Sequence, residues 1–267
     1  MSTESFRVGF YARAFPDFSL ADLEVTVKLL SEEIGKQLGI QTSVTVFKDL
    51  AEMRNAFEHG EINFVVASSL NLANEFENSQ FSDGFRMVTT NEFNDTLVVM
   101  TRKNAGLDNF KSLAGKRLTL VENDPIAHLY IDTLAVSHFN KHYYESFKVV
   151  KNETKYMQII LKLFFGQTDV ICMYQNAYAV ASELNPQIIA KLQIVSQING
   201  IPQGLGFFHK STSPIFREKV IAELLKLDTH TRGRELLQLF KADKTIRTSP
   251  ADLIPVKQLS ASLNKSP

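Results

Sequence analysis

The stretch FRVGFYARAFPDFSLADLEVTVKLLSEEIGKQLGIQTSVTVF (residues 6–47) decides the fold class, because it contains a strand, a helix and a second strand in that order. An apolar run over 6–11 and a β-branched run over 42–47 predict the two strands. Between them, apolar residues recur at helical spacing from Leu20 to Leu38, and Gly39 follows as a suitable helix stop. A strand, a covering helix and another strand are typical of a parallel sheet flanked by helices.

The same alternation continues outward along the chain. A helix with Asp49 as its candidate N-cap and Gly60 at its end leads into a buried strand over 62–67. Two extended runs, FRMVTT and DTLVVMTR, follow, and then the alternation restarts. The chain therefore reads as an α/β protein of two similar halves with a helical C-terminal part. Further strands are predicted over 116–122, 147–151, 168–174 and 192–197, and further helices over 125–139, 155–166, 175–184 and three segments after 213.

Composition and charge narrow the function classes. The 267 residues hold 29 Lys+Arg and 29 Asp+Glu, so the formal net charge is zero and there is no basic footprint for nucleic acid. The single cysteine, Cys172, excludes an internal disulfide and a multi-cysteine metal site, and its apolar surroundings (DVICMY) predict a buried, inert thiol. No apolar run approaches the roughly 18 residues of a membrane span.

Catalytic and metal motifs do not appear in the sequence. It has no G-x-S-x-G, P-loop, G-x-G-x-x-G or H-E-x-x-H pattern, so we predict no catalytic residue and no cofactor. His138 and His142 stand four residues apart and could share a helix face, but a metal site needs more ligands than this pair. We therefore predict no metal site.

The order of several segments resembles a known family. These are FRVGFYARAF at the start, LAEMRNAFEHGEINFVVASSLNLA, TLVVMTRKNAGLDNFKSLAGKRLTLVEN, LKLFFGQTDVICMY, IVSQINGIPQGLGFFHK and TRGRELLQLFKADK. Each is weak alone, but their order and spacing over nearly the whole chain resemble the type 2 periplasmic binding proteins, in particular the phosphate- and phosphonate-binding components of ABC transporters.

The resemblance implies a two-lobed clamp of the Venus-flytrap type, with mixed sheets flanked by helices. Lobe I would comprise residues 1–98 and 208–267, and lobe II residues 99–207. Strands near 97–101 and 205–209 would form the hinge, and a small ligand would close the cleft between the lobes.

A function follows from the resemblance as an expectation. The protein would be a monomeric, periplasmic solute-binding protein, not an enzyme, that delivers a small polar ligand to an ABC permease. The segment MSTESFRVGF has no basic and apolar signal regions, so we expect that an export signal was removed. Two alternatives stay open: the ligand-binding sensor domain of a signalling receptor, and a biosynthetic enzyme on the same fold.

The turn in LTLVENDPIAHLY (118–130) departs from the family pattern. Phosphonate binders of the family carry a Ser/Thr-Ser-Gly type loop here, whose hydroxyls and helix N–H groups hold the phosphonate oxygens. In this chain Asp124 and Pro125 replace that loop, and Pro125 lacks an N–H donor. We expect the Asp124 carboxylate to cap the helix itself and to repel a phosphonate, although recognition of a cationic group by Asp124 is an alternative.

Residues at strand ends are the candidate ligand contacts in the first half, because ligands of α/β sheets gather at the carboxyl ends of strands. Tyr11 and Arg13 follow the first strand and would face the cleft, unless they belong to a plain surface loop. Ser68 and Ser69 follow the third strand and either contact ligand or serve as helix caps. Asn71 stands near the position where the family has a tyrosine.

The second half offers five more candidates by the same rule. Asp124 and His128 lie at the start of the helix after 118–121, although a histidine there is often packed or solvated. Tyr174 and Asn176 follow the strand ending at 173, and core packing is the alternative for Tyr174. Gln203 lies in GIPQGLG near the second predicted crossing, where a plain turn is the alternative.

Overall fold

A computed structural model describes residues 4–14, 18–90 and 94–263, and it divides the chain into two compact units. Unit 1 comprises Met1–Thr90 and Gly204–Ile254, and unit 2 comprises Asn91–Gln203 and Pro255–Pro267. Each unit contains a five-stranded sheet, and in unit 1 a two-stranded sheet adds to it. Among the described residues, no helix has the length and apolar character needed to cross a membrane.

Unit 1 is built on a sheet with the strand order β2-β1-β3-β11-β4. Strands β1, β2 and β3 are parallel, and β11 runs antiparallel to β3. Helices α1, α9 and α10 pack their apolar residues on this sheet through a core that contains Phe6, Phe64 and Phe208. The elements are β1 (Phe6–Tyr11), α1 (Leu20–Leu38), β2 (Thr42–Phe47), α2 (Leu50–Glu58), β3 (Phe64–Ser68), α3 (Ser69–Glu75), β4 (Phe81–Ser82), β5 (Gly84–Val88), β11 (Gly204–His209), α9 (Pro214–Leu224), α10 (Thr231–Leu239) and β12 (Lys244–Thr248), with short 3-10 turns at Ala12–Ala14, Asn78–Gln80, Leu227–Thr229 and Pro250–Leu253.

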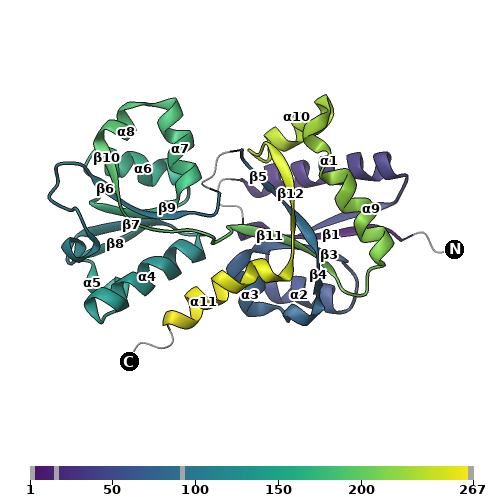
Figure 1. The fold of residues 1–267 in the computed structure, drawn as a ribbon, viewed down its shortest axis with the longest axis horizontal. Coiled ribbons are helices and arrows are strands. Elements are labelled where there is room, and N and C mark those ends of the chain that lie inside the picture. The colour runs from purple at the N-terminus through teal and green to yellow at the C-terminus, as the bar shows by residue number, and fades with distance from the viewer. Residues whose placement is uncertain (1–3, 15–17, 91–93, 264–267) are drawn as a thin grey trace. The chain divides into compact units, whose positions relative to one another are not determined.

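Unit 2 has the strand order β10-β6-β9-β7-β8. Strands β7, β8 and β9 are parallel, whereas β6 runs antiparallel to both β9 and β10. Figure 1 shows α4 and α5 on one side of this sheet and α6, α7 and α8 on the other. The elements are β6 (Leu97–Arg102), a 3-10 turn (Phe110–Leu113), β7 (Arg117–Val121), α4 (Pro125–Phe139), α5 (Tyr143–Ser146), β8 (Val149–Glu153), α6 (Tyr156–Phe164), β9 (Val170–Tyr174), α7 (Gln175–Leu184), α8 (Gln187–Lys191) and β10 (Leu192–Ile198); α11 (Ile254–Leu263) begins at the last residue of unit 1.

Residues predicted to start and end helices do so in the structure. Ser19 caps α1, and Gly39 ends that helix in the left-handed conformation at φ 63°. Asp49 caps α2 by accepting from the backbone N–H groups of Ala51 and Glu52. Cys172 is free and fully buried in β9, as the sequence predicted.

The observed unit boundaries differ from the sequence-based lobe boundaries. Strand β6, predicted as a crossing, belongs wholly to unit 2 because it pairs with β9 and β10 along its length. Strand β11 belongs wholly to unit 1 because it pairs with β3 and β4. Residues 255–263 of α11 group with unit 2 rather than with the other C-terminal helices. The hinge formed by strands near 97–101 and 205–209 stays a prediction.

The idea that His138 and His142 share a helix face is wrong. Asn140 adopts the left-handed conformation (φ 55°) and ends α4 between them. His142 then stands at the N-cap of α5, where its Nδ1 atom lies 2.9 Å from a carboxylate oxygen of Asp132. No group of three metal-ligating side chains occurs among the residues that the structure describes.

Candidate functional site

In unit 1, the predicted site residues follow the carboxyl ends of parallel strands. Tyr11 ends β1 and is half-buried, and Arg13 is exposed in the 3-10 turn that follows. Ser68 ends β3 and caps α3, since its Oγ atom accepts from the backbone N–H of Asn71 at 3.2 Å. Ser68 and Ser69 are both buried and Asn71 is half-buried. This geometry supports the capping role of Ser68, and ligand contact by these residues stays a prediction.

In unit 2, Asp124 occupies the N-terminus of α4. Its Oδ1 atom accepts from the backbone N–H of Ala127 at 3.1 Å, and its Oδ2 atom accepts from the Tyr156 hydroxyl at 2.8 Å. The residue is 3% exposed, and Pro125 follows at the first helical position, where no N–H is available. The predicted helix cap is therefore present, and the backbone N–H of Ala127 already donates to the Asp124 carboxyl group.

A chain of hydrogen bonds extends from this carboxylate toward the surface. Gln203 donates from Nε2 to the Tyr156 hydroxyl at 2.8 Å, and that hydroxyl donates in turn to Asp124. Tyr156 is buried, whereas Gln203 is half-buried. The structure thus brings together two predicted residues, Asp124 and Gln203, through a third that the sequence analysis missed. Tyr156 follows a strand end, β8, so the rule applied to the other strands could have found it.

The electrostatics of Asp124 follow from its burial. Loss of solvent raises the pKa of the Asp124 carboxyl above its ordinary value, although the hydrogen bonds from Ala127 and Tyr156 oppose this shift. Burial also raises the pKa of the Cys172 thiol, and the nearby Asp124 charge adds to that effect. Burial therefore disfavours the reactive thiolate form of Cys172.

His128 has both ring nitrogens in internal hydrogen bonds. Its Nε2 atom lies 3.0 Å from the carbonyl oxygen of Val121, and its Nδ1 atom lies 3.1 Å from the Tyr143 hydroxyl. Because a carbonyl can only accept, Nε2 donates to Val121, and Nδ1 shares the second hydrogen bond with the Tyr143 hydroxyl. This arrangement ties α4 to the end of β7 and supports a structural role for His128.

The remaining predicted residues of unit 2 lie at the end of β9. Tyr174 is fully buried at the N-cap of α7, which supports core packing, and Asn176 is half-buried in the first turn of that helix. Tyr130, in α4, has its hydroxyl oxygen 2.9 Å from Ser196 Oγ. Burial raises the pKa of Tyr130 to about 12. That phenol is therefore a neutral structural link between α4 and β10.

Comparison with known proteins gives a family and a fold. Residues 13–253 match the family model described as ABC transporter, phosphonate, periplasmic substrate-binding protein. No curated protein matches the sequence.

Three solved structures are similar to almost the full length of the chain. A binding protein component of an ABC phosphonate transporter from Pseudomonas aeruginosa has a TM-score of 0.69 at 12% identity, covering 99% of this chain and 88% of that one. PhnD1 from Prochlorococcus marinus in complex with methylphosphonate has a TM-score of 0.69 at 16% identity, covering 99% and 100%. The periplasmic aliphatic sulphonate binding protein SsuA from Escherichia coli has a TM-score of 0.56 at 12% identity, covering 98% and 92%. These likenesses confirm the predicted type 2 periplasmic-binding-protein fold.

Proposed function

Because the chain belongs to the periplasmic substrate-binding proteins of ABC phosphonate transporters, we propose that it captures a small polar solute and delivers it to an ABC permease. We further propose that this solute is not a phosphonate held in the way of the family. The expected location is the periplasm and the expected partner in transport is the permease.

The observation that carries the second proposal is the buried Asp124 carboxyl group. In either protonation state of Asp124, its Oδ1 atom accepts from the backbone N–H of Ala127, and Pro125 has no N–H to donate to a ligand. In the ionised state it would also repel an oxyanion placed at the same helix end. An oxyanion at this end of α4 would therefore have to displace a carboxyl group that is hydrogen-bonded on both oxygens.

The polar groups left for a ligand favour an uncharged or amine-bearing organic molecule. Glu122 is exposed directly after β7, and Gln203 is half-buried at the outer end of the hydrogen-bonded chain. An amide can both donate and accept, and a carboxylate accepts from an amine. We expect Gln203 to contact the ligand. That both units hold the ligand stays a prediction.

A thermal-shift screen over amines, amino acids, phosphonates and sulfonates tests this proposal. A compound present at 100 times its dissociation constant stabilises the native state by about 2.7 kcal/mol, so true ligands stand out. We expect hits among amines or amino acids and none among phosphonates. In the Gln203→Ala variant the apparent affinity of a hit should fall by up to about tenfold, because a ligand hydrogen bond to a polar group contributes about 1.4 kcal/mol or less.

Gln167→Ala is the matched control, because Gln167 is exposed in unit 2 before the amino end of β9, on the edge away from Asp124. A hit whose affinity falls equally in both variants would contradict the assignment of Gln203. A phosphonate that binds at low concentration would contradict the ligand class.

A further inference from the structure

Basic residues gather on the edge of the unit 2 sheet that lies opposite Asp124. Because β7, β8, β9 and β10 run one way and β6 runs the other, this edge contains four strand starts and the end of β6. Six basic residues lie at or next to these strand ends, and we call them the basic edge: Arg102, Lys103, Lys116, Arg117, Lys148 and Lys191. Four acids lie at the same end, Asp108, Glu145, Asp169 and Glu183, so the six cations of the basic edge outnumber the carboxylates.

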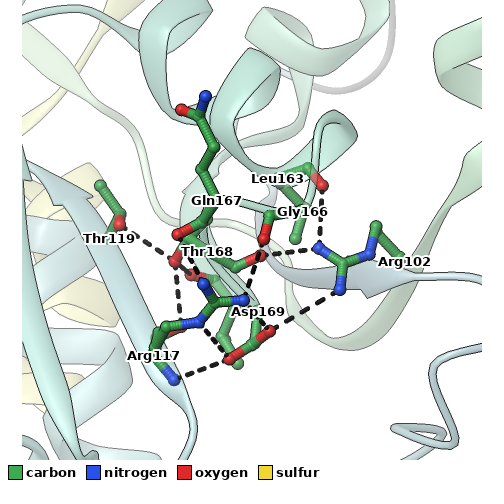
Figure 2. Close-up of polar contacts among 9 residues, drawn as sticks. Arg102, Arg117, Thr119, Leu163, Gly166, Gln167, Thr168 and Asp169 are labelled. Carbon is green, nitrogen blue, oxygen red and sulfur yellow. Dashed lines mark hydrogen bonds and ion pairs between the residues drawn. The ribbon is translucent and has the colours of Figure 1, made fainter.

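One carboxylate serves both arginines of the basic edge, as Figure 2 shows. Arg117 donates to Asp169 from Nη2 at 2.7 Å and from Nε at 2.9 Å, and Nη2 of Arg102 lies 3.7 Å from the same residue. Arg117 holds the pKa of the Asp169 carboxyl below its usual range, so this acid is ionised. The cluster therefore keeps one uncompensated positive charge.

The same cluster fixes the turn that follows α6. Arg102 donates to the carbonyl oxygens of Thr168 at 2.9 Å and Leu163 at 3.3 Å, and Arg117 donates to the carbonyl oxygen of Gly166 at 2.9 Å (Figure 2). Phe165 stands directly before this turn and is 68% exposed. A large apolar side chain is thus exposed in a turn whose backbone is hydrogen-bonded to the two arginines.

Two more exposed apolar side chains adjoin the basic edge. Ile189 is 53% exposed, and its carbonyl oxygen accepts from Lys103 Nζ at 2.8 Å. Leu184, at the end of α7, is 74% exposed and precedes α8, whose last residue is Lys191. Lys191 Nζ lies 4.3 Å from the centre of the Phe164 ring, which places the end of α8 against the end of α6. Phe165 directly follows α6, Leu184 ends α7 and Ile189 lies in α8, so the three exposed side chains come from the helices that reach this end of the sheet.

We propose that this surface, made of the basic edge with Phe165, Leu184 and Ile189, binds the surface of an anionic lipid membrane. Neighbouring strands lie about 4.8 Å apart, so the five strand ends spread their cations over roughly 19 Å, the scale of several lipid headgroups. The apolar side chains come singly from or next to three different helices, which suits shallow insertion between headgroups. The cations would then lie at the level of the lipid phosphates.

Co-sedimentation of the full chain with lipid vesicles tests the proposal. One set of vesicles contains equal parts of phosphatidylglycerol and phosphatidylcholine, and the other contains phosphatidylcholine alone. We expect binding to the anionic vesicles only, and weaker binding at high ionic strength because salt screens the attraction. Each surface cation contributes about a fivefold factor in affinity, so the Lys103→Glu, Lys148→Glu, Lys191→Glu triple variant should bind about a hundredfold more weakly or worse.

Two further variants separate the basic edge from net charge and from folding. Lys28→Glu, Lys36→Glu, Lys210→Glu changes the net charge equally but alters only exposed lysines of unit 1 that lie away from the carboxyl ends of its parallel strands, and it should bind as the unaltered chain does. Phe165→Ser should reduce binding about tenfold or more without changing the circular dichroism spectrum, since the side chain is mostly exposed.

Three results would overturn the proposal. The first is equal loss of binding in the two triple variants, and the second is unchanged binding in the basic-edge variant. The third is no binding to either type of vesicle, which would exclude a membrane and favour a protein partner with an acidic surface. Ligand-induced thermal shifts should be the same in all of these variants, so failure here is distinct from failure of the proposed transport function.

Discussion

Removal of the Asp124 side chain should destabilise unit 2 by a modest and specific amount. The Asp124→Ala change deletes an N-cap, which costs about 1 kcal/mol, and leaves the buried Tyr156 hydroxyl without its acceptor, which costs about 1–2 kcal/mol. Relief of the buried charge offsets part of this loss, since burial disfavours the ionised carboxyl. We expect a net loss of about 1–2 kcal/mol, which lowers the melting temperature by roughly 2–8 °C.

Asp124→Asn is the matched comparison, because its Oδ1 atom can still cap Ala127. Its Nδ2 atom can donate to the Tyr156 hydroxyl once the Gln203 amide turns its oxygen to accept from that hydroxyl. The free energy of unfolding of this variant should stay within about 1 kcal/mol of that of the unaltered chain. Differential scanning calorimetry is the suitable assay because it can resolve separate transitions in a chain of two units. An Asn variant as unstable as the Ala variant would refute the capping argument.

The pH dependence of this comparison has a defined sign. The folded-state pKa of Asp124 is raised, so the folded chain binds more protons at this site than the unfolded chain does. The stability of the unaltered chain relative to Asp124→Asn should therefore fall as pH rises from the ordinary Asp pKa through the raised folded value, and then stay constant. A relative stability that increases over that window would refute the assignment of a buried, disfavoured charge.

Two further substitutions and one labelling experiment have expected outcomes. Asp169→Asn should cost about 1 kcal/mol or less at neutral pH in urea unfolding, because it removes the ion pair with Arg117, whose side chain is 42% exposed. Since the folded pKa of Asp169 is lowered, this difference should shrink as pH falls from the ordinary Asp pKa through that folded value, and a constant difference would contradict it. Tyr156→Phe should cost about 1–2 kcal/mol, as it removes a buried hydroxyl that both donates and accepts, whereas Tyr144→Phe, 61% exposed, should change stability by less than about 0.5 kcal/mol. Cys172 should react with thiol reagents only on unfolding, and rapid labelling of the native chain would contradict its burial.

Much of the fold could be predicted because local signals and packing agree. Gly39 ends α1 in a conformation that favours glycine, and Asp49 caps α2, so short-range chemistry alone locates these ends. Asp124 was found for the same reason, since Asp followed by Pro at a helix start acts within a few residues. The unit boundaries were less predictable, because membership of β6 and β11 depends on pairing between strands far apart in the sequence.

The site was predictable only in part, because burial and side-chain partners are long-range properties. Tyr156 and Asp124 are 32 residues apart, and Gln203 is 47 residues beyond Tyr156, so no local pattern reveals their hydrogen bonds. The internal bonds of His128 likewise depend on Tyr143, which lies in a different helix.

A buried carboxyl group, that of Asp124, fills the start of α4, and we propose that it keeps a phosphonate from binding there. Calorimetric titration of the unaltered chain with methylphosphonate tests it most directly. We expect no binding with a dissociation constant below roughly 1 mM, which corresponds to about 4 kcal/mol of binding free energy or less. A micromolar dissociation constant, about 8 kcal/mol, would contradict it.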